Sequence, residues 1–456
     1  MHHVLGFQCL ACGRQHDYQP SAIGHRPSAI YTCPSCGGNL DVVYDYAFIA
    51  RRFSPQALAA NPDATIRRWL PLLPIGDVAS LPPLDIGGTP LYHARRLGER
   101  LGLTQLYLKD DGRNPTASFK DRASAVAVAA AQEIGAKVIT TASSGNAGAA
   151  LAGCAAASGL PSVIFVPHTA PRPKVAQLLM FGAQVFAVRG TYDQAFDLCL
   201  AASAEYGWYN RNTGHNPYTR EGKKTCAFEV AEQLGNQGIR ESGNQGINIP
   251  DKVFVAVGDG NIISGLWKGF RDLLALGWSE RLPQLIGVQA EGAAPLVRAW
   301  ERVTLTPSPL SLVGRGAGDE GLIQPVEAHT IADSICVGRP RDGLAALRAV
   351  HETGGRFIAV SDEEILQAMR DLARDAAVFA EPSGATGFAG LGKLVAQGLV
   401  RSDERVVVVV TGSGLKDVEA AVQAGGQPTF IEPTVEGLRA ALSQAKLAEC
   451  EITSTR

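Results

Sequence analysis

The chain has 456 residues, 46% of them hydrophobic, so it can bury more than one sizeable core and should form two or three domains. Its 42 basic and 44 acidic residues give a formal net charge of −2, and no basic stripe with interleaved aromatics is present. Nucleic acid is therefore not an expected partner. No apolar run approaches membrane-spanning length and no signal-peptide pattern precedes Cys9, so we expect a cytoplasmic protein without a membrane partner.

Two cysteine pairs near the start of the chain predict a zinc ribbon over residues 1–45. Cys9-Leu10-Ala11-Cys12 and Cys33-Pro34-Ser35-Cys36 have the spacing of a closed tetrahedral site with four thiolate ligands. Gly13 and Gly37 follow the pairs and permit the tight turns that aim the sulfurs. The alternative is a ribbon that has kept its cysteines without a metal.

Beyond a proline-rich connecting arm at residues 46–85, strands and helices alternate, which predicts parallel sheets. The first alternating region has expected strands at 106–109, 138–141, 162–166 and 185–188, and expected helices at 123–135, 147–158, 174–182 and 192–206. A second such pattern runs from residue 253 to about residue 422. Two α/β units with a cleft between them are therefore expected.

Lys120 is the candidate nucleophile. It lies in Asn114-Pro115-Thr116-Ala117-Ser118-Phe119-Lys120-Asp121-Arg122, where a helical pattern begins. A buried ammonium group loses solvation, so its pKa falls and the neutral amine can attack an aldehyde. The alternative for any lysine taken alone is a solvated surface charge.

Three further segments place polar groups at the ends of expected strands. Ser143-Ser144-Gly145-Asn146 offers amide and hydroxyl donors for a carboxylate, or simple helix capping. Gly258-Asp259-Gly260-Asn261-Ile262 lets backbone N–H groups approach a phosphate at a helix start, unless it is an ordinary tight turn. Thr411 follows a run of five valines and places a hydroxyl at the carboxyl end of a buried strand, where open α/β sheets bind ligands. It could equally satisfy a nearby backbone group.

With Gly87-Gly88-Thr89-Pro90-Leu91 and Glu381-Pro382-Ser383-Gly384-Ala385, these motifs resemble those of the fold-type II pyridoxal-phosphate enzymes. Within that group the chain is similar to the threonine synthases, over about residues 85–420. The resemblance implies an α/β fold of two three-layer domains around a central cleft, with a small N-terminal zinc ribbon. It also implies bound pyridoxal 5'-phosphate, a small amino-acid substrate and a homodimer.

The resemblance assigns a role to each motif. It implies that Lys120 attaches the cofactor as a Schiff base and later acts as general base, and that Asn146 contacts the pyridine 3-hydroxyl. Residues 258–262 would hold the cofactor phosphate and Thr411 would meet the pyridine nitrogen. Substrate binding would fall to the four residues Ser143, Ser144, Gly145 and Asn146.

The predicted domain division follows the same comparison. Residues 1–45 form the ribbon, 46–85 the arm, 86–120 and 225–425 the large cofactor-binding domain, 121–224 the smaller α/β domain, and 426–456 a C-terminal tail. Because the ribbon is expected to serve packing or assembly, we expect zinc removal to loosen residues 1–45 while the cofactor site survives. A near-duplication, Gly235 to Ile239 and Gly243 to Ile247, predicts a polar surface loop.

The implied reaction converts O-phospho-L-homoserine and water to L-threonine and phosphate, by γ-elimination followed by addition at Cβ. In many threonine synthases the second residue after Asn-Pro is arginine, whereas here Asn216-Pro217 is followed by Tyr218, Thr219 and then Arg220. In an extended segment, Arg220 would face the opposite side from Thr219. The candidates for a replacement charge are Lys174, Lys223 and Lys224.

Two alternatives to threonine synthesis remain open at this stage. The first is a sibling pyridoxal-phosphate enzyme, of the cysteate synthase, threonine or serine dehydratase, or diaminopropionate ammonia-lyase type. The second is a ribbon-containing protein without enzymatic activity that retains a cofactor fold.

Overall fold

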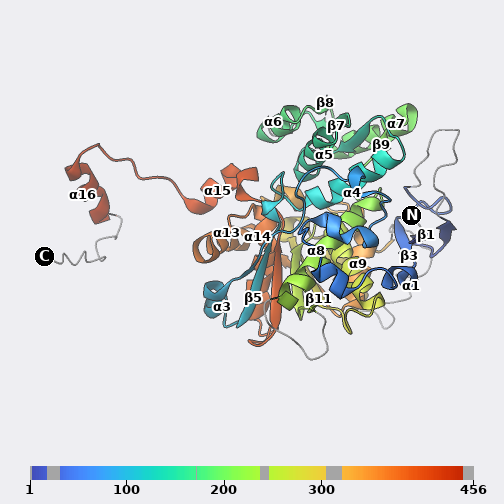
Figure 1. The fold of residues 1–456 in the computed structure, drawn as a ribbon. Helices are drawn as coiled ribbons and strands as arrows, with labels where there is room; N and C mark the ends of the chain where they lie inside the picture. The colour runs from blue at the N-terminus through green and yellow to red at the C-terminus, as the bar shows by residue number, and fades with distance from the viewer. Residues whose placement is uncertain (1–2, 18–30, 171, 237–245, 305–320, 445–456) are drawn as a thin grey trace.

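The computed structural model describes all residues except 1–2, 18–30, 171, 237–245, 305–320 and 445–456. Its described residues form three sheets, and the predicted α/β class with a small N-terminal module is confirmed (Figure 1). The near-duplicated segment falls largely within 237–245, outside the described residues. No described helix combines the length and apolar character that crossing a membrane requires.

The N-terminal module is an antiparallel sheet of order β2-β1-β3, built from β1 (Val4–Cys9), β2 (Gln15–Asp17) and β3 (Leu40–Tyr44). The arm continues it with α1 (Tyr46–Ala50), α2 (Pro55–Ala59) and two 3-10 turns, η1 (Ile66–Leu72) and η2 (Val78–Ser80). Trp69 of η1 is fully buried, with its ring 4.9 Å from that of Phe228 on a helix of the large domain. The arm is therefore packed onto the α/β body of the protein.

The smaller α/β unit has a parallel sheet of order β8-β7-β6-β9. Its strands are β6 (Ile139–Ala142), β7 (Ser162–Pro167), β8 (Gln184–Val188) and β9 (Tyr209–Asn210), and its helices are α5 (Asn146–Ala157), α6 (Arg172–Met180) and α7 (Tyr192–Tyr206). The strands and helices predicted in this region are all found, with ends that differ by a few residues at most.

The larger unit has a sheet of order β12-β11-β10-β13-β5-β4, parallel except for β4. Its strands are β4 (Leu91–His93), β5 (Gln105–Asp110), β10 (Lys252–Ala256), β11 (Gln284–Ala290), β12 (Arg356–Val360) and β13 (Arg405–Val410). The five valines of β13 are fully buried, as expected for a central parallel strand. Since β13 lies between β10 and β5, the segments that follow these three strands meet at one edge of the sheet.

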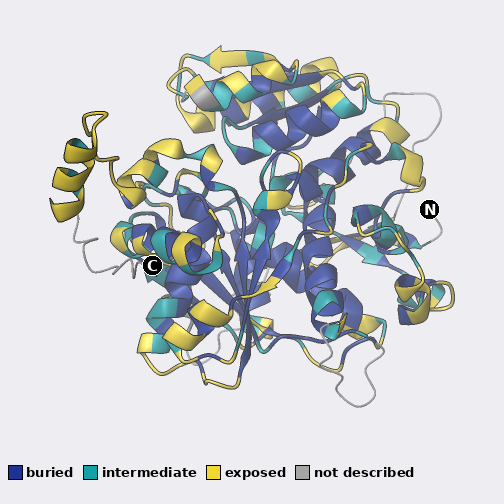
Figure 2. Cartoon of the chain, turned by 60° about the vertical axis from the view of Figure 1, so that its left-hand side comes forward, coloured by how far each residue is buried: buried dark blue, intermediate teal, exposed yellow. Residues whose placement is uncertain are grey.

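Helices cover both faces of the large sheet, which Figure 2 shows as a buried centre beneath more exposed helices. They are α3 (Arg95–Leu101), α8 (Tyr218–Asn236), α9 (Asn261–Ala275), α10 (Pro295–Thr304), α12 (Gly343–Glu352), α13 (Asp362–Ala376), α14 (Pro382–Ala396) and α15 (Val418–Gly425). Helix α16 (Val435–Gln444) stands apart from the body and is largely exposed (Figures 1 and 2). The exact domain boundaries given by the sequence stay a prediction.

Helix α4 (Lys120–Glu133) packs against both α8 and α5 and is fixed at its start by buried charges. The Arg122 guanidinium donates from Nε to Asp111 Oδ2 at 2.6 Å and from Nη1 to Glu229 Oε1 at 2.5 Å. Lys109 Nζ donates to Glu229 Oε2 at 2.7 Å, and these four side chains are almost completely buried. Although burial alone would raise it, Arg122 and Lys109 hold the pKa of Glu229 at about 2.

Replacement of Arg122 by glutamine is expected to lower the free energy of unfolding by about 3–5 kcal/mol, because Asp111 and Glu229 would lose a buried partner. Denaturant unfolding would measure the change. The matched control is Arg281→Gln. Arg281 is exposed and pairs with the half-buried Asp251 at 3.0 Å, and its other hydrogen bonds go to the backbone oxygens of Ile249 and Pro250, so the expected cost is about 0–1 kcal/mol. Equal effects of the two substitutions would contradict this account.

Candidate active site

One pocket gathers most of the predicted cofactor residues. Lys120, residues 258–262 and Thr411 all line it, and it holds about 450 Å³ of space, part of it open to solvent. The backbone explains how Lys120 reaches the strand ends. Phe119 N donates to Thr411 O at 2.9 Å, and Ser118 forms a β-bridge with Gly412. The loop before α4 is thus pinned to the end of β13.

The segment 258–262 is shaped to let a ligand approach the backbone at the start of α9. Gly260 has φ +89°, and a Cβ there would lie 2.8 Å from Asp342 O and from Ala346 Cβ. A Cβ at Gly258 would lie 2.9 Å from Ile335 Cα. Helix α9 begins at Asn261, so free N–H groups and the positive end of the helix dipole face this turn. These are the features that a phosphate group requires.

Lys120 has the environment expected of a reactive amine. Burial lowers its pKa, an effect that Glu381 opposes and Arg211 reinforces. The Nζ atom forms no hydrogen bond or ion pair with any described residue. Its amine is therefore free to react with an aldehyde in the pocket, and a fit to pyridoxal phosphate follows from the lysine together with the loop at 258–262.

Asn146 lies at the start of α5 and reaches across to the large domain. Its Nδ2 donates to Glu381 Oε1 at 2.7 Å and to Ser334 Oγ at 3.2 Å, and Ser334 lines the Lys120 pocket. Burial raises the pKa of Glu381, while nearby Lys120 acts in the opposite sense. Asn146 therefore contacts a residue of the pocket lining without lining the pocket itself.

The predicted substrate segment surrounds a second, adjoining hollow. Ser144, Gly145 and Asn146 line it with Ala149, Lys174, Gln177, Leu415 and Lys416. Ser143 lies just outside this lining, and its Oγ accepts a hydrogen bond from Gly145 N at 3.3 Å. The two lysines give the hollow a positive character suited to a carboxylate.

Several pocket residues were absent from the sequence prediction of the site. Ser383 at the start of α14, together with Ser334 and Thr213, lines the Lys120 pocket, and Glu381 binds Asn146. Glu381 and Ser383 belong to a motif that the family resemblance already contained, so a signal for them existed. Thr213 lies three residues before Asn216, in the segment that the sequence connects with the substrate, so it also had a signal. Ser334 had none, because polar residues in loops are ordinary.

The structure corrects the interpretation of the segment after Asn216-Pro217. Thr219 and Arg220 are in the first turn of helix α8, so the assumption of an extended segment is wrong. Their side chains nevertheless diverge. Thr219 Oγ1 donates to Asn216 O at 2.8 Å, whereas Arg220 Nη2 donates to Asp342 Oδ1 at 2.5 Å. Arg220 is therefore already committed to a structural ion pair.

The three candidate replacement lysines lie in different places. Lys223 lines the Lys120 pocket, and its Nζ donates to Asn261 Oδ1 at 2.5 Å. Lys174 lines the adjoining hollow and pairs with Asp333. Lys224 is buried between Glu221 and Asp272 and lines neither space. Of the three, Lys223 alone belongs to the Lys120 pocket.

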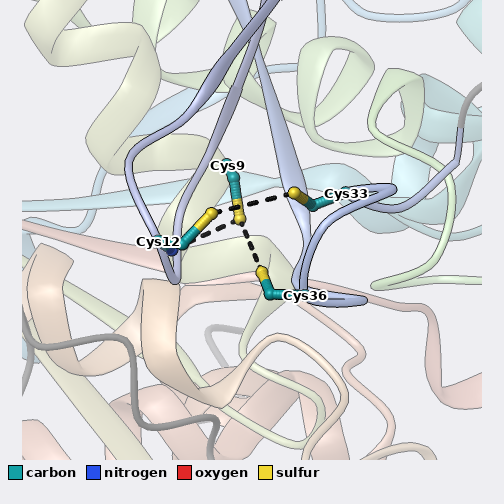
Figure 3. Close-up of side chains that lie close together, drawn as sticks. All are labelled: Cys9, Cys12, Cys33 and Cys36. Carbon is teal, nitrogen blue, oxygen red and sulfur yellow. Dashed lines mark hydrogen bonds between the residues drawn. The ribbon is translucent and has the colours of Figure 1, made fainter.

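The four predicted metal ligands come together at the tip of the ribbon (Figure 3). Cys9, Cys12, Cys33 and Cys36 place their sulfur atoms within 4.8 Å of one another. The Sγ atoms of Cys9 and Cys36 are 3.5 Å apart, and those of Cys12 and Cys33 are 3.7 Å apart. A tetrahedral zinc ion with Zn–S distances of about 2.3 Å would place its ligand sulfurs roughly 3.8 Å apart, so the set fits zinc.

The ribbon contacts the loop at 258–262 through Asp342, which is buried. Asn39 Nδ2 donates to Asp342 Oδ1 at 3.1 Å, and Asn261 Nδ2 donates to Asp342 Oδ2 at 2.7 Å. Arg220 adds a second route, since its Nη1 pairs with Asp41 at 3.0 Å while its Nη2 pairs with Asp342. Ribbon residues therefore help to position the start of α9.

Comparison with known proteins places the chain by sequence. The family described as "Pyridoxal-phosphate dependent enzyme" matches residues 83–412. The chain is 37% identical over 438 residues to the threonine synthase of Methanocaldococcus jannaschii, covering 96% of this chain and 99% of that one. It is 36% identical over 445 residues to the threonine synthase of Methanosarcina acetivorans, covering 97% and 99%. Both matches extend over the ribbon as well as the cofactor domains.

The fold of the chain is similar to that of several solved structures. Diaminopropionate ammonia lyase from Escherichia coli superposes with a TM-score of 0.60 at 20% identity, covering 80% of this chain and 93% of that one. Threonine deaminase isoform 2 from Solanum lycopersicum gives a TM-score of 0.57 at 22% identity, covering 79% and 83%. These likenesses confirm the predicted fold.

Replacement of Gly260 by alanine is expected to weaken cofactor binding by about tenfold or more. The added Cβ would clash with Asp342 O and displace the turn at residues 258–262, which is proposed to bind the phosphate. Titration of the cofactor-free protein with pyridoxal phosphate would measure the affinity. Gly277→Ala is the matched control, since Gly277 follows α9 at φ +69° with nothing within 4 Å of its Cβ position. It should strain the backbone without changing cofactor affinity.

Proposed function

This chain belongs to the threonine synthase family of pyridoxal-phosphate-dependent enzymes, and from that premise we propose that it makes L-threonine and phosphate from O-phospho-L-homoserine and water. The observation that carries the proposal is the similarity to threonine synthases over almost the whole chain, ribbon included. The dehydratase and ammonia-lyase structures share the fold at 20–22% identity, which supports no particular reaction.

The proposed roles of the pocket residues follow from their positions. Pyridoxal phosphate supplies an electron sink that makes the proton on the substrate Cα acidic. Lys120 would attach the cofactor, the backbone of residues 258–262 would bind its phosphate, and Asn146 and Thr411 would contact its ring. The Thr411 hydroxyl would leave the ring nitrogen largely unprotonated, whereas a carboxylate at that position would hold it as a cation.

Lys120 is also the proposed general base. Because burial lowers the pKa of its amine, Lys120 loses its proton more readily than an exposed lysine does, and the neutral amine can accept the Cα proton. The hollow lined by Ser144, Gly145 and Asn146 is linked to the Lys120 pocket by the hydrogen bond from Asn146 to Ser334, and it would hold the substrate carboxylate. The chain thereby orients the amino acid with its side chain toward the Lys120 pocket.

The first experiment is a visible absorption spectrum of the purified protein, with threonine and phosphate assayed after addition of O-phospho-L-homoserine. A visible band of the lysine-bound cofactor and equal amounts of the two products are expected. Lys120→Ala should lose the band and at least about a thousandfold of the activity, since it removes both the attachment and the base. The exposed Lys137→Ala is the control and should change neither.

Two outcomes would overturn the proposal. The first outcome is release of phosphate without formation of threonine, which would contradict a role in threonine biosynthesis. The second outcome is that the cofactor-loaded protein leaves O-phospho-L-homoserine intact but acts on serine, threonine or diaminopropionate. The protein would then catalyse a related pyridoxal-phosphate reaction and not threonine synthesis.

We further propose that Cys9, Cys12, Cys33 and Cys36 hold a structural zinc ion. The sulfur spacing supports this, and so does His16, whose Nε2 lies 3.3 Å from Cys33 Sγ, the position of an outer hydrogen-bond partner. Four protein ligands leave no open position, so the metal would take no part in the reaction. Its role would be to hold the ribbon against the body.

Removal of this metal by a chelator is expected to weaken cofactor binding by roughly 2- to 30-fold, since Asn39 and Asp41 would no longer be held against Asp342 and Arg220. Cofactor titration before and after chelation, with metal content measured, would test this. Asn39→Ala should reproduce part of the loss in protein that keeps its metal. Unchanged affinity in the metal-free protein would contradict the coupling.

As smaller proposals, we infer that the protein is cytoplasmic and forms a homodimer, which the family resemblance implies. Light scattering of the purified protein would test the oligomeric state, and a monomer would refute that part.

A further inference from the structure

Arg211 is a buried cation without a matching anion. It follows β9, is 0% exposed, and forms no ion pair with any carboxylate of the described residues. Its Nε donates to Ser124 Oγ at 3.2 Å and its Nη1 donates to Thr213 Oγ1 at 2.9 Å. The Nη2 atom is buried with no hydrogen-bond partner among the described residues. Burial lowers the pKa of Arg211 to about 10, the sign of a desolvated charge.

The unpaired, buried guanidinium of Arg211 destabilises the folded protein unless a ligand accepts its free hydrogen bonds. A guanidinium group has five N–H donors in a fixed fork, and a buried donor left unpaired carries a desolvation penalty. Buried arginines that serve the fold alone look different in this protein. Arg122 and Arg220 are each paired with two carboxylates.

The position of Arg211 relates it to the Lys120 pocket. Thr213, to which it donates, lines that pocket, as does Lys223. Arg211 is close enough to Lys120 and Lys223 to lower the pKa of both, after the larger effect of burial. The carboxylates close enough to raise the pKa of Arg211 are Asp121 and Asp259, and neither forms an ion pair with it. Asp121 accepts a hydrogen bond from Thr116 N at 2.7 Å, and Asp259 accepts one from Arg341 N at 3.2 Å.

We propose that Arg211, with Thr213 and Lys223, forms the site that binds the phosphate group of the substrate, beside the turn at 258–262 that binds the phosphate of the cofactor. The inference rests on the proposed function and assigns the phosphate contact that Thr219 lacks. Arg211 supplies the planar fork that phosphate oxygens accept from, and Thr213 holds one side of that fork in place. Lys223, hydrogen-bonded to Asn261, lies at the start of α9 and supplies charge between the two anions.

The other candidate cations are excluded by their contacts. Arg220 is held by Asp342 and Asp41, and Lys224 is held by Glu221 and Asp272. Lys174 lines the adjoining hollow, which is the proposed carboxylate site.

The test compares Arg211→Gln with the unaltered, cofactor-loaded protein. The KM for O-phospho-L-homoserine is expected to rise about 10- to 100-fold, whereas binding of L-threonine, which has no phosphate, should change less than about twofold. Arg211→Lys keeps the charge but loses the fork and should give a smaller rise. Thr213→Val should raise the KM by a few-fold, and the exposed Arg281→Gln should have no effect.

A second readout needs no turnover. Inorganic phosphate should bind to the cofactor-loaded protein, measured by calorimetry, and Arg211→Gln should weaken that binding about tenfold or more. Because the cofactor already occupies the turn at 258–262, this phosphate reports the second site. Equal phosphate binding by both proteins would overturn the proposal.

The outcomes separate this inference from the proposed function. If the unaltered protein makes threonine and Arg211→Gln has an unchanged KM, the function stands and the assignment of Arg211 is wrong. If the unaltered protein makes no threonine, phosphate binding still decides whether Arg211 holds a phosphate group. Should Arg211→Gln fail to fold or load cofactor, Arg211→Lys and Thr213→Val give the same comparison, and unchanged phosphate binding in both would overturn the assignment.

Discussion

The buried ion pairs of Arg122 fix the position of the reactive lysine. Arg122 is two residues after Lys120, and its guanidinium joins Asp111, which follows β5, to Glu229 on α8. Charges buried without partners are strongly unfavourable, so these ion pairs oppose any displacement of the start of α4. Lys120 is the first residue of α4, so the ion pairs that hold the start of this helix also hold its backbone in place. Its own amine forms no ion pair with the part of the chain that the structure describes, and this difference leaves it available for chemistry.

A second buried carboxylate organises the other side of the pocket. Asp342 accepts hydrogen bonds from Asn39 of the ribbon and from Asn261 and Ser264 of α9, and it pairs with Arg220 of α8. The turn that is shaped for a phosphate therefore rests partly on the ribbon. The sequence predicts a cofactor site that survives loss of zinc from the ribbon, whereas these contacts favour a site that is weakened by it.

The two networks explain why cationic residues can accumulate in one pocket. Burial lowers the pKa of Lys120, Lys223 and Arg211, and Arg211 lowers the pKa of both lysines further. Such a group is unfavourable by itself and becomes favourable when anions bind. A cofactor and a substrate that each carry a phosphate would supply them. On this account the chain folds without ligands, but the positive charges of its pocket are balanced only when the anionic ligands bind.

Much of this protein could be predicted from its sequence. Hydrophobic periodicity gave the strands and helices of both α/β units, because side-chain direction repeats locally in each. The ribbon ligands and the phosphate-shaped turn could be found because cysteine spacing and glycine backbone freedom are local properties. Lys120 and Thr411 were found as members of motifs, and the structure places both at the same pocket.

The tertiary structure alone decided which charges are satisfied. Nothing near Arg211 in the sequence distinguishes it from Arg220, yet among the described residues Arg211 has no paired carboxylate and Arg220 has two. The partners of Arg220 are Asp41 and Asp342, far away along the chain in both directions, and folding alone brings them together. The same holds for Glu381, which meets Asn146 across the cleft. A local pattern determines where a side chain points, whereas its charge state and availability depend on neighbours that only the packed chain supplies.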